Sequence, residues 1–226
     1  MHPVRPASPP RRPRPVLALT AALALPSALL LVLVALRWSP LMRLDRDVAR
    51  SLHGRALAEP GVTHVNRVLT DWVWDPWTMR ALCAVIVLVL VRRSRDWLLA
   101  GWVAATCLIG ALLQQGLKSA VDRPRPVWRD PVDSAHYAAF PSGHAMTAAV
   151  VCGLVLWLLR RHGAGRPLWR TALTLAVVSV LGVGLTRLWL GVHWPSDVLA
   201  GWLLGALTVA VSTAAYDRWV APNARA

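Results

Sequence analysis

The stretch TALTLAVVSVLGVGLTRLWLGVHWPSDVLAGWLLGALTVAVSTAA, residues 171–215, decides the fold class of this chain. It holds two apolar runs, Thr171 to Leu190 and Val198 to Ala215, on either side of a short polar turn. A helix of roughly 20 apolar residues crosses the hydrocarbon core of a bilayer, which is about 30 Å thick. The stretch therefore predicts two membrane helices that hold the polar turn at one membrane surface.

Four further apolar runs precede that pair. They cover residues 16–38, 77–91, 97–117 and 145–159, and the second and fourth are short enough to need an extra turn from flanking residues. The composition agrees, since 56% of the 226 residues are hydrophobic, 16% are charged and the mean hydropathy is +0.46. The sequence predicts an all-α fold, a polytopic membrane helical bundle of about six transmembrane helices.

Arginine clusters predict the orientation, because short loops rich in Lys and Arg stay cytoplasmic. Such clusters precede the first run, follow the second and follow the fourth: Arg5, Arg11, Arg12 and Arg14, then Arg92, Arg93 and Arg95, then Arg160, Arg161, Arg166 and Arg170. We therefore expect a multi-pass protein of the cell membrane with cytoplasmic N- and C-termini. The loops after the first, third and fifth runs are then extracytoplasmic.

The chain divides into four predicted parts. These are a disordered basic tail (1–15), N-terminal membrane helices with an extracytoplasmic loop at 39–76 (16–96), a catalytic core (97–215) and a C-terminal tail (216–226). The first apolar run is long for a cleaved signal peptide, which favours an uncleaved helix. Within the loop 39–76, Leu44, Val48 and Leu52 recur at helical spacing, which indicates an interfacial helix.

The residues that carry chemistry gather in three segments beside the later extracytoplasmic loops. They are the segment from Lys118 to Pro126, the segment Pro141-Ser142-Gly143-His144, and the segment from Thr186 to Asp197. Ionisable groups at a membrane boundary are costly to hold there, so a function is the default explanation when they converge on one face. The predicted topology makes these three segments converge.

Three fixed cations in these segments predict a compact polyanion as ligand. Lys118, Arg125 and Arg187 supply them, and Lys118 is the only lysine among the 25 basic residues. Guanidinium groups suit bidentate phosphate oxygens, and an ammonium acts as a point charge. Ser142 and Gly143 precede a predicted helix, whose free N–H groups form an anion site.

Two histidines complete the predicted catalytic set. His193 lies four residues before Asp197, whose carboxylate is expected to fix its tautomer and stabilise its cationic form, so His193 is the candidate nucleophile. His144 would protonate the departing lipid oxygen and then activate water for hydrolysis of a phosphohistidine intermediate. The sequence assigns no role to His53, His64 and His136, nor to Asp122, Asp130 and Asp133, which are expected to keep the loop soluble or balance arginines.

Lys118 with Arg125 and Pro126, then Pro-Ser-Gly-His144, then Arg187 with His193 and Asp197, resembles the three-part signature of the type 2 phosphatidic acid phosphatase superfamily. The resemblance covers roughly residues 97–215. It implies a six-helix membrane phosphatase with a metal-independent phosphohistidine mechanism and kinship with vanadium haloperoxidases. One position departs from the pattern, because Thr186 stands where the family usually has Ser.

The predicted function is hydrolysis of a lipid phosphate or lipid pyrophosphate, such as a polyprenyl pyrophosphate or phosphatidate, at the extracytoplasmic face. Two alternatives stay open: a non-catalytic phospholipid-binding transporter or receptor, and a phosphotransferase with an alcohol acceptor. We expect no cofactor and no metal, because three fixed cations repel a metal ion. The expected partners are the lipid phosphate and the bilayer, and the oligomeric state is not predicted.

Two sequence features have simpler explanations. The net charge of +14 does not predict nucleic-acid binding, because the arginines lie in short clusters between apolar runs and form no single basic face. Gly201 and Gly205 form a pair of small residues at helical spacing, which indicates close helix packing within the chain.

Overall fold

The computed structural model describes residues 14–220, which form helices and connecting loops without a strand. The α-helices are α1 (Arg14–Ala35), α2 (Ser39–Ala58), α3 (Pro60–Val68), α4 (Pro76–Val89), α5 (Trp97–Val121), α6 (Gly143–Arg161), α7 (Arg166–Trp189) and α8 (Pro195–Ala215). Short π-helical turns follow α3, α4 and α8: η1 (Leu69–Val73), η2 (Leu90–Ser94) and η3 (Tyr216–Val220). The predicted tails lie outside the described residues, apart from Arg14, Pro15 and η3.

Within residues 14–220, six helical stretches are long and apolar enough to cross a membrane. They are Leu17–Ala35, Pro60–Ser94, Trp97–Val121, Gly143–Arg161, Arg166–Trp189 and Pro195–Arg218. The predicted helical bundle is thus confirmed. The second and fourth spans are extended beyond their apolar runs, as expected, and Asp75 begins α4 by accepting a hydrogen bond from the backbone N–H of Trp77 at 2.5 Å.

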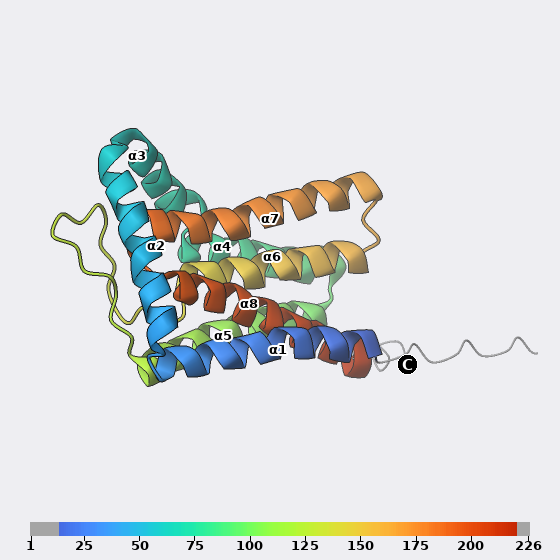
Figure 1. The fold of residues 1–226 in the computed structure, drawn as a ribbon. Coiled ribbons are helices and arrows are strands. Elements are labelled where there is room, and N and C mark those ends of the chain that lie inside the picture. The colour runs from blue at the N-terminus through green and yellow to red at the C-terminus, as the bar shows by residue number, and fades with distance from the viewer. Residues whose placement is uncertain (1–13, 221–226) are drawn as a thin grey trace, which may run out of the picture.

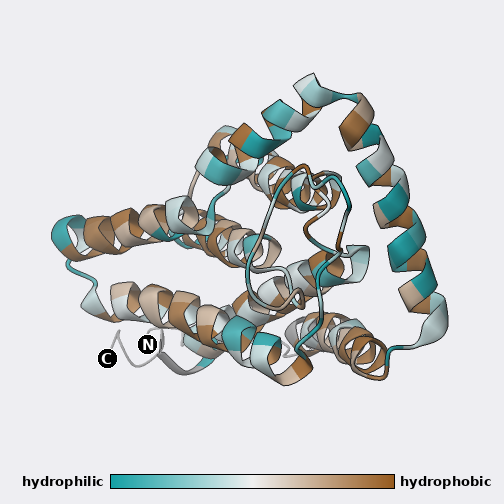
Figure 2. Cartoon of the chain, turned by 90° about the vertical axis from the view of Figure 1, so that its left-hand side faces the viewer, coloured by the Kyte–Doolittle hydropathy of each residue, from teal (hydrophilic) through white to brown (hydrophobic). Residues whose placement is uncertain are grey.

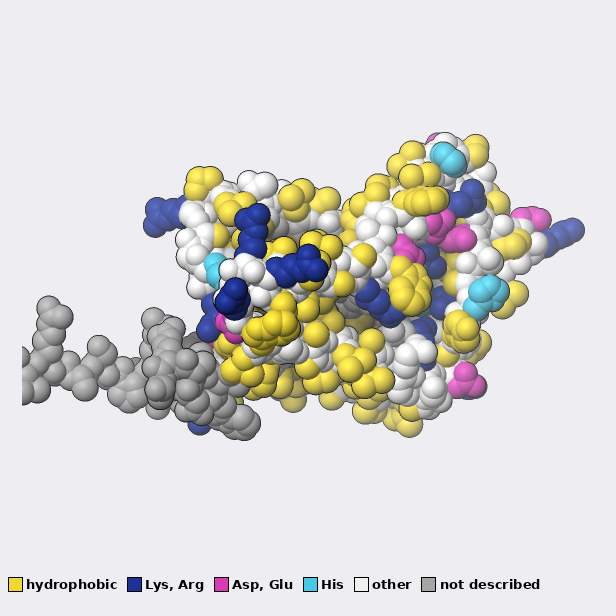
Figure 3. All heavy atoms as spheres, turned by 180° about the vertical axis from the view of Figure 1, so that it is seen from behind, with side chains coloured by type: hydrophobic (Ala, Val, Ile, Leu, Met, Phe, Trp, Pro, Cys, Tyr) yellow, Lys and Arg dark blue, Asp and Glu magenta, His cyan; other side chains and the backbone are white. Residues whose placement is uncertain are grey.

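The long helices α1, α5, α6, α7 and α8 run side by side, and α2 crosses one end of the bundle (Figure 1). We call this the α2 end; the loop 122–142 and the turn 190–194 lie there too. Charged side chains gather at both ends, with a largely hydrophobic band between them (Figure 3). A chain with this band between two charged ends is a multi-pass membrane protein.

The helices α6 and α8 pack closely at two glycines, which brings two of the predicted motif segments together. A Cβ atom on Gly201 would lie 2.7 Å from the carbonyl oxygen of Ser142, and one on Gly205 would lie 2.7 Å from the Cβ of Ala149. The predicted close packing within the chain is confirmed. In addition, the backbone N–H of Ser142 donates to the carbonyl oxygen of Asp197 at 2.9 Å. The start of α6 is thereby held against the start of α8.

The predicted helix in the loop 39–76 is present as α2, and it packs a partly polar face against the rest of the protein. Its buried residues are Asp45, Ala49, His53 and Ala56, whereas Leu44 is 58% exposed. The hydropathy of the sequence does not reveal this buried face, because its polar side chains have hydrogen-bonding or stacking partners inside the protein. His53 stacks on the indole of Trp128 with ring centroids 4.1 Å apart, and Asp45 accepts hydrogen bonds from Arg123 and Ser196.

Candidate functional site

The three predicted phosphate-binding cations meet at the α2 end, although they come from three parts of the chain. Lys118 lies in the last turn of α5, Arg187 lies in the last turn of α7, and Arg125 lies in the loop between α5 and α6. We call these residues the cation cluster. Lys118 and Arg187 are buried, and burial of like charges so close together is unfavourable without an anion.

Main-chain carbonyl groups are the chief partners of the cation cluster. Arg125 donates to the carbonyl oxygens of Val192, Tyr137 and His136 at 2.6, 2.8 and 3.0 Å, and Lys118 donates to that of Ala138. The loop 122–142, which supplies three of these carbonyls, lies in front of the helix ends when the bundle is viewed from the α2 end (Figure 2). Lys118 and Arg125 are therefore solvated mainly by dipoles, which supply no full negative charge.

Arg187 differs from the other two cations in lying within 4 Å of a carboxylate. Its Nη1 lies 3.8 Å from Oδ2 of Asp133 and 3.3 Å from Oγ1 of Thr70. Asp133 therefore does balance an arginine, as the sequence suggested. The distance is long for a charge-assisted hydrogen bond, which is usually about 2.7–2.9 Å.

Two buried polar atoms in the predicted site lack a hydrogen-bond partner among the described residues. They are the hydroxyl oxygen of Ser142, at the start of α6, and Nε of Arg187. A buried polar group without a partner costs about 1–3 kcal/mol, more if charged. Both atoms are donors of the kind that a phosphate oxygen would satisfy.

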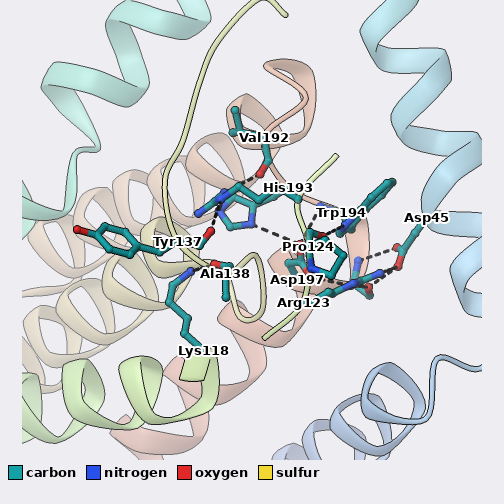
Figure 4. A network of polar contacts seen from close by, with 12 residues as sticks. Asp45, Lys118, Arg123, Pro124, Tyr137, Ala138, Val192, His193, Trp194 and Asp197 are labelled. Atoms are coloured by element: carbon teal, nitrogen blue, oxygen red, sulfur yellow. Dashed lines mark hydrogen bonds and ion pairs between the residues drawn. The ribbon is translucent and has the colours of Figure 1, made fainter. Parts of the chain in front are cut away.

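His193 is buried, and its two ring nitrogens face different surroundings (Figure 4). Nδ1 lies 3.4 Å from Oδ2 of Asp197, whereas Nε2 lies 3.1 Å from Nη1 of Arg125 in the cation cluster. Burial, followed by the charges of Arg125, Arg187 and Lys118, lowers the pKa of His193 well below its ordinary value. The imidazole is thus neutral at neutral pH.

The remaining predicted residues lie beside these groups. His144 and Gly143 form the first turn of α6, and His144 interacts electrostatically with His193 and with each member of the cation cluster. Burial and the nearby charge of Arg187 lower the pKa of Arg125 to about 10, so its guanidinium stays protonated at neutral pH. The structure thus brings all eight predicted site residues together: Lys118, Arg125, Ser142, Gly143, His144, Arg187, His193 and Asp197.

Two buried charged residues of the site were not predicted. Nη1 of Arg123 donates to Oδ1 of Asp197 at 2.6 Å, and Nη2 of Arg123 donates to Oδ2 of Asp45 at 2.7 Å. In the sequence, Arg123 looks equivalent to Arg125, two residues later, and Asp45 lies in a mixed-charge stretch without a motif. The only signal for either residue is the contact itself, which joins α2 to α8.

Comparison with known proteins identifies the family. The model of the PAP2 superfamily matches residues 97–221, which is more than half of the chain. The chain belongs to the PAP2 superfamily. This match confirms the resemblance drawn from the three segments, and it covers nearly the same residues as the predicted catalytic core. As a family member, the chain is a membrane phosphatase and a hydrolase.

Two proteins of similar sequence are phosphatases named for lipid substrates. The chain is 36% identical to the decaprenylphosphoryl-5-phosphoribose phosphatase of Mycobacterium tuberculosis over 135 residues, 60% of this chain and 68% of the relative. It is 36% identical to the phosphatidylglycerophosphatase B of Bacillus subtilis over 118 residues, 51% of this chain and 56% of the relative.

Solved structures confirm the fold. A transmembrane PAP2-type phosphatidylglycerolphosphate phosphatase from Bacillus subtilis superposes with a TM-score of 0.77 at 23% identity, covering 89% of this chain and 98% of that chain. Aquifex aeolicus LpxE superposes with a TM-score of 0.54 at 20% identity, covering 76% of this chain and 95% of that chain.

Proposed function

We propose that this PAP2 phosphatase hydrolyses a lipid phosphate monoester or pyrophosphate at the extracytoplasmic membrane surface through a phosphohistidine on His193. The observation that carries the proposal is the environment of His193. Its buried, neutral imidazole faces a carboxylate with Nδ1 and the cation cluster with Nε2. A neutral nucleophile beside three cations suits attack on an anionic phosphate.

Substrate binding replaces the carbonyl partners of the cation cluster with phosphate oxygens. Lys118, Arg125 and Arg187 supply the charge, and Ser142 Oγ and Arg187 Nε supply donors that lack partners among the described residues. Phosphate oxygens carry full charge, so these hydrogen bonds are stronger than those to carbonyl oxygens. The exchange of carbonyl oxygens for phosphate oxygens therefore favours binding of the substrate.

In the first chemical step, Nε2 of His193 attacks the terminal phosphorus, and the bond to the leaving oxygen breaks. The leaving oxygen is the lipid oxygen of a monoester or the bridging oxygen of a pyrophosphate. His144, as an imidazolium, donates a proton to the departing oxygen and becomes neutral, and the cation cluster stabilises the equatorial phosphate oxygens. Asp197, on the far side of the ring, stabilises the positive charge that forms on the imidazole. The products are phosphohistidine and the lipid with one phosphate fewer, which is the lipid alcohol from a monoester or the lipid monophosphate from a pyrophosphate.

In the second step, His144 removes a proton from water, which attacks phosphorus and breaks the bond between nitrogen and phosphorus. Inorganic phosphate leaves, and His193 returns to its neutral form. Both steps need an imidazole on each side of the phosphorus. His144 at the start of α6 and His193 in the turn before α8 are the two candidates. The mechanism requires no metal ion.

A phosphate-release assay in detergent tests this function. Candidate substrates are phosphorylated prenyl sugars and phosphatidylglycerophosphate, which the names of the two relatives indicate, together with polyprenyl phosphates, polyprenyl pyrophosphates and phosphatidate. His193→Gln is expected to lose activity by a factor of roughly a million, the scale seen for removing a catalytic histidine. Full activity in excess chelator is also expected. A His193→Gln variant as active as wild type would contradict the mechanism.

Product analysis separates the proposal from its two alternatives. A transporter or receptor would bind lipid phosphate through the cation cluster without releasing inorganic phosphate. A phosphotransferase would form a new phosphate ester when an alcohol is added, at the expense of inorganic phosphate. The proposed hydrolase releases phosphate in proportion to lipid consumed, with or without the alcohol.

Cysteine labelling in intact cells tests the proposed side of the membrane. Tyr137 is 86% exposed in the loop 122–142 at the α2 end, and Gly165 is exposed between α6 and α7 at the opposite end. Tyr137→Cys is expected to react with an impermeant maleimide in intact cells, and Gly165→Cys only after permeabilisation. The reverse pattern would place the site on the cytoplasmic side.

A further inference from the structure

A buried chain of charges continues behind His193 into α2 (Figure 4). Arg123 lies between two carboxylates, Asp197 at 2.6 Å and Asp45 at 2.7 Å. Asp45 is 1% exposed and Asp197 is 0% exposed, so water screens neither charge. Asp45 lies in α2, outside the residues that match the family model. We call Asp45, Arg123 and Asp197 the carboxylate network.

Asp45 is also fixed to the first turn of α8. Its Oδ1 accepts from the backbone N–H of Ser196 at 3.0 Å, and its Oδ2 accepts from the hydroxyl of Ser196 at 2.5 Å. Asp197 is held in turn by the backbone N–H of Trp194 at 2.9 Å. The two carboxylates therefore keep fixed positions relative to the imidazole that Asp197 faces.

The charges of the carboxylate network explain why a second carboxylate is needed. Arg123 alone would neutralise Asp197, so the pair would offer no net charge to an imidazolium. Asp45 adds one negative charge, which gives the network a net charge of −1 while His193 is neutral and balances His193 when it becomes cationic. The balance matters because the other neighbours of His193 carry three positive charges.

We propose that Asp45 is a positioning residue that acts through Arg123 to preserve the net negative charge behind His193 as phosphohistidine forms. The inference rests on the proposed function, since it concerns the same imidazole. Asp45 does not touch the reacting atoms. It compensates Arg123, so that Asp197 stabilises the developing imidazolium.

The charged and titratable groups that face His193 come from every element packed around it. They are Lys118 of α5, Arg125 of the loop, His144 of α6, Arg187 of α7 and Asp197 of α8, with Asp133 beyond Arg187 and Arg123 and Asp45 beyond Asp197. Removal of the Asp45 charge therefore makes the surroundings of His193 more positive.

The variant Asp45→Asn tests the proposal because it removes the charge and keeps an acceptor for Ser196. Arg123 keeps Asp197 as its counter-ion, so we expect a melting temperature in detergent close to that of wild type. We expect kcat to fall roughly tenfold to a hundredfold, as happens when a hydrogen-bonded partner behind a functional ligand is lost, with little change in KM. The control is Asp47→Asn in the same helix, because Asp47 is 72% exposed.

The pH profile separates an electrostatic role from a structural one. A more positive environment disfavours the imidazolium, so the acidic limb of kcat/KM is expected to move to lower pH in Asp45→Asn. The ionisation of the substrate is the same for both proteins. A loss of activity with an unmoved acidic limb would overturn the proposal, as would an Asp45→Asn enzyme with wild-type kcat.

A double variant gives an independent test. Asp45→Asn combined with Arg123→Gln removes the negative charge of Asp45 and the positive charge of Arg123. Asp197 then supplies a net charge of −1 behind His193. We expect the double variant to be more active than Asp45→Asn alone. Equal or lower activity of a folded double variant would contradict the charge balance.

These outcomes are distinguishable from failure of the proposed function. If wild-type protein released no phosphate, or if release survived His193→Gln, the function itself would be wrong. If wild type is active, His193→Gln is inactive and Asp45→Asn equals Asp47→Asn, the function stands and only the role of Asp45 is wrong.

Discussion

The carboxylate network and the cation cluster lie on opposite sides of one imidazole and satisfy their charges in opposite ways. Arg123, in the network, contacts two buried carboxylates at 2.6 and 2.7 Å. Arg125, two residues later, contacts three carbonyl oxygens and Nε2 of His193. The same side chain is thus neutralised inside the protein at one position and left with an unbalanced charge at the other.

This difference indicates that the carboxylate network and the cation cluster have different roles. A guanidinium already paired with two carboxylates has little capacity left for a phosphate, so Arg123 belongs to the scaffold behind the nucleophile. A guanidinium paired with carbonyl dipoles gains a full counter-charge when phosphate arrives, so Arg125 belongs to the binding surface. The comparison is tested by variants that affect one region at a time.

The largest expected effect comes from Arg123→Gln. This variant leaves Asp45 and Asp197 buried side by side without a counter-ion, and removing one partner of a buried ion pair destabilises a protein by about 3–5 kcal/mol. Thermal unfolding in detergent measures the loss. A variant as stable as wild type would mean that the network does not hold α2 to α8.

The next effect is on catalysis and comes from Arg125→Gln. We expect kcat/KM to fall by about 10²–10³, the usual cost of one transition-state donor, with the melting temperature preserved. Arg129→Gln, which changes an exposed arginine of the same loop, is the control and should match wild type. If Arg125→Gln mainly lowered the melting temperature, the proposed difference between Arg123, which serves the fold, and Arg125, which binds phosphate, would be wrong.

A smaller effect is expected for Ser142→Ala. Removal of a buried hydroxyl without a partner among the described residues should leave stability unchanged or slightly higher, because no hydrogen bond is lost. Activity should fall about tenfold to a hundredfold, since one hydrogen bond to a charged group is worth about 1.5–3 kcal/mol. Assays of both properties on one preparation check this. Lower stability with full activity would show that the hydroxyl serves the fold.

The smallest expected effect is a shift of the acidic limb of the pH profile of kcat/KM relative to the pKa of a free imidazole. Burial and the cation cluster lower the pKa of His193, so its neutral, nucleophilic form persists into acid solution. The acidic limb of kcat/KM should therefore lie below pH 6.5, the value of a free imidazole. A limb above that pH would mean that the carboxylate network outweighs the cation cluster at His193.

The sequence predicted the part of the molecule that depends on local pattern. Hydropathy is sufficient for the six spans, and the three motif segments name Lys118, Arg125, Ser142, His144, Arg187, His193 and Asp197. Each of these residues lies at the end of a span or in a connection between two spans, so the alternation of spans alone brings them to one end of the bundle.

The sequence did not predict the contacts between distant residues. Asp45 and Arg123 are 78 positions apart, and hydropathy counts a paired, buried aspartate as a surface residue. Leu44, Val48 and Leu52 do not belong to the buried face of α2, so their helical spacing gave no sign of that face. The carbonyl groups that contact Lys118 and Arg125 belong to the main chain, which leaves no signature in residue types.

The central claim, that His193 is the nucleophile between these two regions, is tested most directly by rapid-quench labelling with a ³²P-labelled lipid phosphate. We predict an acid-labile, base-stable phosphoprotein in wild type with the label mapped to His193, a longer-lived label in His144→Gln, and none in His193→Gln. Label on another residue, or label that persists in His193→Gln, would contradict the account.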